Sequence, residues 1–332
     1  MRPPVLLAVD GNSLVHRSFH ALAGSGLRGA DGRPTWAVRG FCSQLFGALE
    51  RIGADAVVVG FDDSTTSARK TRWPEYKATR KPKPVELVQQ IADTIALLRQ
   101  AGVAVVVPEG LEADDVLASA AQTAAAAGWE TVLVTSDRDA FALVDETTSV
   151  LRLINGGVDV SPLLNRKLLH ILVRVHAHQY REYAALRGDT SDNLTGVHGI
   201  GAKTAAKLLA EFETVDEAFA DADAGGGRII KALGKAAVGK LLKPDNRLVF
   251  RRNVEIMTMH RDLGLGLDLA GQGHGCLPLD THRLATALRA FTLSAVEPAA
   301  LRALARASAV IPAVVLPAVT SAPEPIWQET LF

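Results

Sequence analysis

The sequence predicts an α/β domain with a mostly parallel sheet, followed by a helical domain. Short runs of branched apolar residues alternate with helical stretches up to about residue 155, a pattern typical of strands joined by covering helices. From about residue 165 to about residue 308 these runs disappear and helical patterns dominate. A chain of 332 residues with 48% hydrophobic content is long enough for about two domains with packed cores.

Four apolar runs are predicted strands of the sheet. They cover Val5–Val9, Ala56–Phe61, Val103–Val107 and Thr131–Ser136. Runs of this kind are typical of parallel strands that are buried on both faces. Between them, Glu86–Gln100 has an amphipathic helical pattern and Ala113–Ala127 is rich in alanine, the strongest helix former. Both segments are expected to cover the sheet.

Aspartates follow the ends of three predicted strands, at Asp10, Asp62 and Asp137. Ligands of parallel sheets bind at the carboxyl ends of the strands, so these side chains are expected to point at one place. Like charges crowded there would repel one another and raise each other's pKa. The arrangement makes chemical sense mainly if divalent cations hold the carboxylates together, which indicates a metal site.

A second acidic group, Glu112, Asp114 and Asp115, opens the alanine-rich helix. Acidic side chains at a helix N-terminus stabilise the helix dipole, so capping is the simpler interpretation. One acid is enough for a cap, and three acids in four positions favour metal binding.

The remaining acidic pairs lie in turns. Asp139 follows Asp137 two residues later, and Asp189 and Asp192 lie at the start of the predicted helical domain. Aspartates are common in ordinary turns, so each pair alone is weak support for a metal site.

A basic segment between residues 69 and 83 is interrupted by aromatic residues. Its cations are opposed only by Glu75, and Trp73 and Tyr76 lie among them. Basic charge supplies phosphate affinity, and aromatic faces can stack on the bases of a single strand. A solvated charged helix is the alternative, but the position one loop after Asp62 favours binding of nucleic acid beside the metal site. The basic residues are Arg69, Lys70, Arg72, Lys77, Arg80, Lys81 and Lys83.

A glycine motif in the helical region predicts contact with a DNA backbone. Gly199 and Gly201 precede a helical pattern, and glycines at such a junction let the backbone approach a phosphate that the first helical N–H groups can bind. Lys203 and Lys207 are four residues apart and share a helix face with Thr204 beside them. A purely structural helical hairpin is the alternative.

Composition gives weaker indications. Lysine plus arginine equals aspartate plus glutamate at 36 each, so no overall basic bias points to nucleic acid. The two cysteines form no disulfide framework, which fits a reducing cytoplasm. The N-terminus lacks the apolar region of a secretory signal, and every apolar stretch is too short to span a membrane.

Together these motifs resemble the bacterial 5'-nuclease family, meaning the 5'-3' exonuclease domain of DNA polymerase I and the related flap endonucleases. The resemblance covers roughly residues 5 to 300 in family order. The matching segments are Val9–Asn12, Arg17–Leu22, Val59–Asp62, Tyr76–Lys77, Glu112–Asp115, Thr135–Asp139, Tyr183–Asp189, Ser191–Asn193 and the glycine motif.

The resemblance implies a domain organisation. A PIN-like, resolvase-like nuclease core is expected at residues 1–165, with a helical arch at about 66–90. A helical domain is expected at residues 166–308, with a helix-hairpin-helix (H3TH) motif at 188–212. Residues 309–332 are expected to be a linker and tail.

The resemblance also implies roles for single residues. Two or more Mg²⁺ or Mn²⁺ ions are expected, and K⁺ at the helix-hairpin-helix motif. One metal group would be Asp10, Asp62, Glu112, Asp114 and Asp115, and the other Asp137, Asp139, Asp189 and Asp192. The groups that grip phosphates at the cleavage site would be Arg17, Lys77 and Arg80. The DNA-binding set would be Tyr76, Lys77, Arg80, Gly199, Gly201, Lys203, Thr204 and Lys207.

The implied function is a metal-dependent, structure-specific 5' nuclease. It would act as a monomer in the bacterial cytoplasm, at the nucleoid, on DNA with 5' ends or flaps and on RNA–DNA hybrid primers. Because the chain ends soon after the nuclease region, a free-standing enzyme is expected. Two alternatives are a PIN-type ribonuclease, against which the helix-hairpin-helix motif argues, and a non-catalytic protein that binds branched DNA, against which the complete set of nine acids argues.

The final residues suggest a protein partner. Gln328, Leu331 and Phe332 resemble the short peptides by which bacterial replication and repair proteins dock on the β sliding clamp. A glutamine with two apolar anchors on a flexible linker suits such docking. In the alternative interpretation Leu331 and Phe332 pack on the domain.

Overall fold

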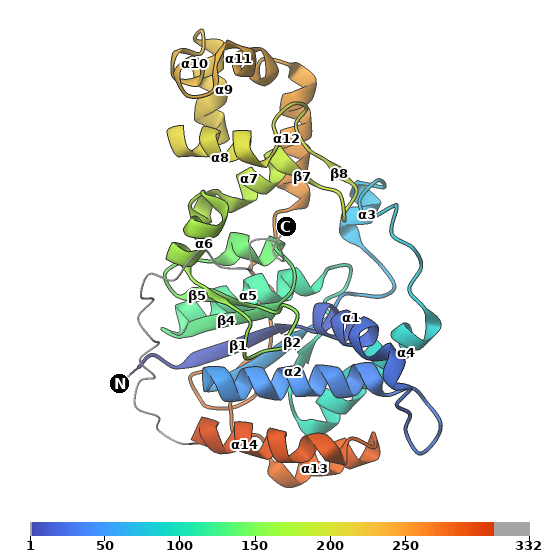
Figure 1. The fold of residues 1–332 in the computed structure, drawn as a ribbon. Helices are drawn as coiled ribbons and strands as arrows, with labels where there is room; N and C mark the ends of the chain where they lie inside the picture. The colour runs from blue at the N-terminus through green and yellow to red at the C-terminus, as the bar shows by residue number, and fades with distance from the viewer. Residues whose placement is uncertain (1, 309–332) are drawn as a thin grey trace.

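The structure is a computed structural model that describes residues 2–308 of the chain. A six-stranded sheet forms its centre, in the order β3-β2-β1-β4-β5-β6 (Figure 1). The pairs among β1 to β5 are parallel, and β6 is antiparallel to β5. The strands are β1 Val5–Asp10, β2 Ala56–Gly60, β3 Ala104–Val106, β4 Glu130–Thr135, β5 Thr148–Arg152 and β6 Leu163–Leu164.

Helices cover both faces of this sheet. Alternate side chains of β1 enter two cores: Leu6 and Ala8 join the core beneath α5, whereas Leu7 and Val9 join the core on the opposite face. This alternation explains the continuous apolar runs, because both faces of each strand are buried. The helices are α1 Gly11–Leu22, α2 Trp36–Ile52, α4 Val85–Ala101 and α5 Ala113–Ala126, with the short turn η1 Ala23–Ser25 after α1.

The last two helices return to the sheet domain. After the helical domain, α13 Thr281–Ala290 packs on α4, and α14 Glu297–Ser308 packs on α2, with η4 Ser294–Val296 between them. Leu284, Leu288 and Leu304 complete the core on that face. The packing therefore places these helices with the sheet domain (Figure 1), not with the helical domain in which the sequence analysis included them.

The helical domain lies on the side of the sheet that α5 covers (Figure 1), and its buried residues belong to the same core cluster as those of α5. A small β7–β8 hairpin separates its helices α7 and α8 and lies close to the segment that contains α3 Ala68–Arg72. The segment expected to be a helical arch holds this five-residue helix, turns and an extended stretch up to α4. The remaining elements are η2 Asp139–Leu143, α6 Arg166–Val173, η3 Ala177–Gln179, α7 Tyr180–Arg187, β7 Gly188–Asp189, β8 Leu194–Thr195, α8 Ala202–Glu211, α9 Val215–Asp223, α10 Gly227–Leu233, α11 Lys235–Leu241 and α12 Pro244–Ile256.

The predicted fold class is confirmed. The four predicted strands and both predicted covering helices are present, and helices dominate from α6 to α12. The strand order reverses between β1 and β4, and the crevice at such a switch point is where parallel sheets bind ligands. In the described part of the chain, no helix has the length and apolar character needed to cross a membrane.

Candidate metal centre and nucleic-acid interface

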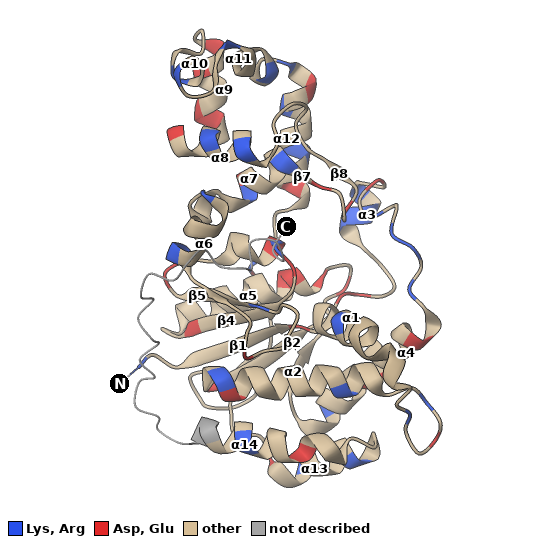
Figure 2. Ribbon diagram, in the orientation of Figure 1, with Lys and Arg blue, Asp and Glu red and all other residues tan. Residues whose placement is uncertain are grey.

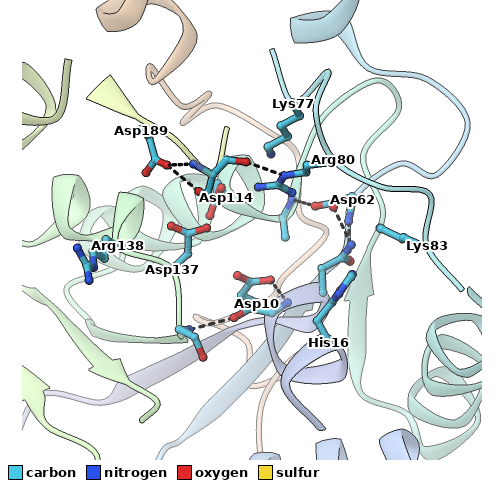
Figure 3. Close-up of a pocket in the computed structure, with 15 residues that line it drawn as sticks. Asp10, His16, Asp62, Lys77, Arg80, Lys83, Asp114, Asp137, Arg138 and Asp189 are labelled. Atoms are coloured by element: carbon cyan, nitrogen blue, oxygen red, sulfur yellow. Dashed lines mark hydrogen bonds between the residues drawn. The ribbon is translucent and has the colours of Figure 1, made fainter. Parts of the chain in front are cut away.

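A pocket of about 500 Å³ opens at this switch point (Figure 3). Its floor comes from the ends of β1, β2 and β4 and from the start of α5, and its rim comes from the basic segment and from β7. The lining residues are Asp10, Asn12, Ser13, His16, Asp62, Lys77, Arg80, Lys83, Ala113, Asp114, Ser136, Asp137, Arg138, Asp189 and Ser191.

Hydrogen bonds orient the carboxylates of the floor. Asp10 ends β1 and caps α1 by accepting from the backbone N–H of Ser13 at 2.9 Å. Its second oxygen accepts from Thr135 Oγ1 at 2.7 Å. Asp62 accepts from Asn12 Nδ2 at 2.6 Å and from the Ala113 N–H at 3.0 Å. The ends of three strands are thereby held around one pocket.

Burial and mutual repulsion raise the pKa of four floor carboxylates. For Asp10 burial contributes most and Asp62 and Asp137 add to it, which raises its pKa to about 7. Burial and neighbouring aspartates also raise the pKa of Asp137, and raise those of Asp114 and Asp139 well above their usual values. We call this group the floor carboxylates; Asp10, Asp114 and Asp137 line the pocket, and Asp139 lies beside them in a small cavity that Asp114 also lines. The group carries more negative charge than its own surroundings compensate.

Other predicted ligands are neutralised by basic side chains of the arch segment. Glu112 accepts from Lys77 Nζ at 2.8 Å and from the Tyr76 hydroxyl at 3.0 Å. Burial alone would raise the pKa of Glu112, but Lys77 and Arg69 outweigh it and hold that pKa below its usual value. We call Glu112, Asp115 and Asp192 the paired carboxylates.

The arch segment also contacts the loop between β7 and β8. Arg80 pairs with Asp192, and Lys77 Nζ lies 3.8 Å from the same carboxylate. The Lys77 N–H donates to the Asp192 carbonyl at 2.9 Å, and Asn193 Nδ2 donates to the Glu75 carbonyl at 2.8 Å. The side chains of Lys77 and Arg80 therefore lie above the acidic floor, as Figure 3 shows.

Two of the residues predicted to contact DNA, Arg17 and Tyr76, lie outside the lining of the pocket. Arg17 does not line the pocket, because its guanidinium donates to Asn155 Oδ1 at 3.1 Å. Tyr76 is only 5% exposed and belongs to the core under α5, so its ring is not available to stack on a base. The Tyr76 hydroxyl donates to Glu112 and thereby orients that carboxylate.

The glycine motif lies in the helical domain, outside this pocket. Gly199 has a φ of +78°, a conformation that favours glycine, and its carbonyl accepts from Lys240 Nζ at 2.8 Å. Lys203 and Lys207 are exposed on α8, where Figure 2 shows basic residues on the helix. Gly201 and Thr204 stand at the start of the same helix.

Within residues 2–308, no three or more Asp, Glu, His or Cys side chains are arranged so that they could hold a metal ion as they stand. The donor set nevertheless suits a hard divalent cation, because it consists of carboxylate oxygens whose charges repel one another. Asp139 Oδ1 is also buried with no hydrogen-bond partner in the described part of the chain.

Several lining residues were not predicted. His16 lies on the face of α1 that also carries Asn12 and Ser13, and its spacing from them is helical. This helical spacing is present in the sequence, but it indicates a pocket residue only once Asp10 is known to cap α1. Arg138 lies between Asp137 and Asp139 in sequence and lines the same pocket.

Comparison with known proteins identifies two matching family models. Residues 5–167 match the 5'-3' exonuclease, N-terminal resolvase-like domain, and residues 175–272 match the 5'-3' exonuclease, C-terminal SAM fold. DNA polymerase I of Mycobacterium tuberculosis is 35% identical over 262 residues, which cover 79% of this chain and 28% of the polymerase. The thermostable DNA polymerase I of Thermus aquaticus is 39% identical over 218 residues, covering 66% and 25%. The chain thus spans less than a third of the length of these relatives.

Solved structures show the same fold. The zinc-bound T5 5'-exonuclease has a TM-score of 0.60 at 19% identity and covers 91% of this chain and 99% of its own. The catalytic core of Rad2 in complex with DNA substrate has a TM-score of 0.56 at 15% identity, with coverage of 90% and 91%.

Proposed function

The chain belongs to the 5'-3' exonuclease family, and on this premise we propose that it hydrolyses DNA phosphodiesters at 5' ends and 5' flaps with divalent cations. Flap cleavage is suggested by the similar fold of the T5 flap endonuclease, which was crystallised with DNA and metal ions. The roles would be primer removal and repair, with RNA–DNA hybrids as further substrates.

The juxtaposition of an acidic floor and a basic arch segment carries this proposal. The floor carboxylates, with Asp62 and Asp189, would hold the cations, and Mg²⁺ and Mn²⁺ are the ions that hard oxygen ligands favour. Divalent cations bound there would polarise the phosphodiester and lower the pKa of water. A nucleophilic side chain is therefore not required.

The residues of the chain would do the binding and positioning. Lys77, Arg80 and Lys83 line the pocket above the floor, where their cations would bind phosphates of the strand to be cut. Lys203 and Lys207 on α8 would hold the duplex through its backbone, with Gly199 and Gly201 allowing close approach. The K⁺ ion at that motif remains a prediction.

The sliding-clamp interpretation concerns Gln328, Leu331 and Phe332, which lie outside the described residues. It rests on the sequence pattern alone. Deletion of residues 328–332 should abolish capture of the clamp in a pull-down without changing DNA cleavage, and capture that persists would disprove the interpretation.

The direct test is cleavage of flap duplexes labelled at the 5' end or at the 3' end, in Mg²⁺ or Mn²⁺. The wild type should cut near the 5' junction, and Asp137→Ala should not. A matched RNA flap distinguishes a ribonuclease. A folded wild type that binds the DNA flap without cutting it would favour a non-catalytic protein.

A further inference from the structure

Asp115 differs from the floor carboxylates in that hydrogen-bond donors occupy both of its oxygens twice. Its side chain is 0% exposed and does not line the pocket. Oδ1 accepts from Arg69 Nη2 at 2.7 Å and from the His260 N–H at 2.8 Å. Oδ2 accepts from Arg69 Nη1 at 2.7 Å and from the Glu112 N–H at 3.0 Å. Both oxygens therefore accept two hydrogen bonds each.

A carboxylate with four acceptor sites filled has no lone pair left for a cation. Arg69 and the backbone N–H groups outweigh burial and hold the pKa of Asp115 below its usual value, the reverse of the direction at Asp114 one residue earlier. The adjacent aspartates thus face opposite environments: Asp114 faces the pocket, and Asp115 faces the interior.

Arg69 uses its remaining donors on the segment that returns from the helical domain. Its Nε donates to the Ile256 carbonyl at 3.0 Å, and Nη2 also donates to the Thr258 carbonyl at 2.9 Å. One turn along α5, Ser119 Oγ donates to the His260 carbonyl at 3.1 Å and accepts from the Leu263 N–H at 3.2 Å. Arg69 of α3 therefore holds residues 256 and 258, and Asp115 and Ser119 of α5 hold residues 260 and 263.

The ion pair therefore joins three parts of the molecule. Asp115 lies on α5 of the nuclease core, Arg69 lies on α3 of the arch segment, and Ile256 ends α12 of the helical domain. A second ion pair, between Arg72 and Glu255 at 2.5 Å, also links α3 to α12.

We infer that Asp115 is not a metal ligand: with Arg69 it is a positioning pair that fixes the arch segment and the helical domain relative to the metal centre. The bidentate fork gives this joint a defined geometry, which a single-point contact would not. Its effect on catalysis rests on the proposed function, whereas its effect on metal binding does not. The pair would set how well the DNA-binding surfaces align with the floor.

The first experiment separates the two adjacent aspartates by metal affinity. Binding of Mn²⁺ to metal-free protein is measured for wild type, Asp114→Asn, Asp115→Asn and Arg69→Lys. Asp114→Asn should bind at least about 10-fold more weakly, whereas Asp115→Asn and Arg69→Lys should stay within about threefold of wild type. Asp115→Asn that weakens Mn²⁺ binding as much as Asp114→Asn would overturn the inference.

The second experiment tests positioning through flap cleavage at saturating Mg²⁺. Arg69→Lys keeps the charge but loses the fork, so KM for the flap should rise about 10-fold or more while kcat changes less. Arg302→Lys, on α14 at the opposite face, is the matched control and should match wild type. An unchanged KM for Arg69→Lys would refute the positioning role.

A variant that fails to fold can be distinguished from one that folds but has lost its function. If Asp115→Asn does not fold, Arg69→Lys leaves the aspartate in place and still tests the positioning role, because an unchanged KM would refute it. If wild type cleaves nothing, the proposed nuclease activity fails, and the Mn²⁺ titration still decides whether Asp115 is a ligand.

Discussion

The floor carboxylates and the paired carboxylates are neighbours in sequence and space, but their electrostatic environments are opposite. Asp10, Asp114, Asp137 and Asp139 have pKa values raised by burial and by one another. Glu112 and Asp115 are also buried, yet Lys77 and Arg69 hold their pKa values low. Residue type and burial are alike on both sides, so the difference lies in the neighbours.

This difference shows which group of carboxylates would be stabilised by a cation from solution. The paired carboxylates already have basic partners, and removing one member would leave an uncompensated buried charge. The floor carboxylates repel one another more strongly than Lys77 compensates, and protons or metal ions would relieve the remaining repulsion. A count of acidic residues in the sequence does not make this distinction.

The largest predicted effect follows from removing one floor charge with Asp114→Asn. Cleavage should fall about 100-fold or more, the usual loss when one charge-stabilising group is removed. In EDTA the same variant should melt at a higher temperature than wild type, because repulsion is reduced. Steady-state kinetics and thermal unfolding measure the two effects.

Glu109→Gln is the control for Asp114→Asn, because Glu109 is an exposed acid of the preceding loop and does not line the pocket. It should change neither cleavage nor melting temperature. A destabilised Asp114→Asn in EDTA would show that the floor carboxylates do not repel one another as described.

The second effect is stabilisation by metal. A ligand at 100 times its Kd stabilises the folded state by about 2.7 kcal/mol, so Mg²⁺ should raise the melting temperature of wild type by several degrees. Asp10→Asn should lose most of this gain. NaCl at equal ionic strength is the control, and an equal gain in NaCl would rule out a specific metal site.

The third effect concerns the basic side chains of the arch segment. Arg80→Ala removes one candidate phosphate contact, so flap binding should weaken several-fold and the slope of log affinity against log salt should decrease by about 0.7 to 0.9. Arg302→Ala, on α14 beyond the sheet, should leave the slope unchanged. An unchanged slope for Arg80→Ala would mean that Arg80 pairs with Asp192 and does not contact a DNA phosphate.

The fold was largely predictable because its main signals are local. Apolar runs such as Val5–Val9 identify strands that are buried on both faces, and helical periodicity identifies α4 and α5. The return of α13 and α14 to the sheet was not predictable in this way. Leu284 and Leu304 fit any amphipathic helix, and only tertiary packing decides which core they join.

The site was predictable in residue type but not in pairing. Strand ends identify Asp10, Asp62 and Asp137, because the carboxyl ends of parallel strands converge. No sequence signal separates Asp114 from Asp115, since the distinction depends on Arg69 and His260, which are 46 and 145 residues away along the chain. Tyr76 likewise depends on burial that its basic surroundings do not indicate.

The smallest predicted effect tests the basic rim by pH. Burial, then Lys83, His20 and Arg80, lower the pKa of His16 from 6.5 to about 4. Between these values the unfolded chain binds more protons at His16 than the folded protein, so this residue destabilises the fold as pH falls from about 6.5 to about 4. Since the side chain is partly exposed, the loss should be about 1 kcal/mol.

The matched comparison is His16→Gln in EDTA, with urea unfolding measured at several pH values from 4.5 to 7.5. Wild type should lose stability relative to His16→Gln as pH falls, and parallel profiles would contradict the lowered pKa. Lys83→Ala should raise the pKa of His16 in an NMR titration, because it removes the neighbouring charge that lowers this pKa most. Such a shift would show that the basic side chains of the rim repel added positive charge, as the floor carboxylates repel added negative charge. Bound DNA phosphates would reduce the repulsion at the rim, and bound metal ions would reduce it at the floor.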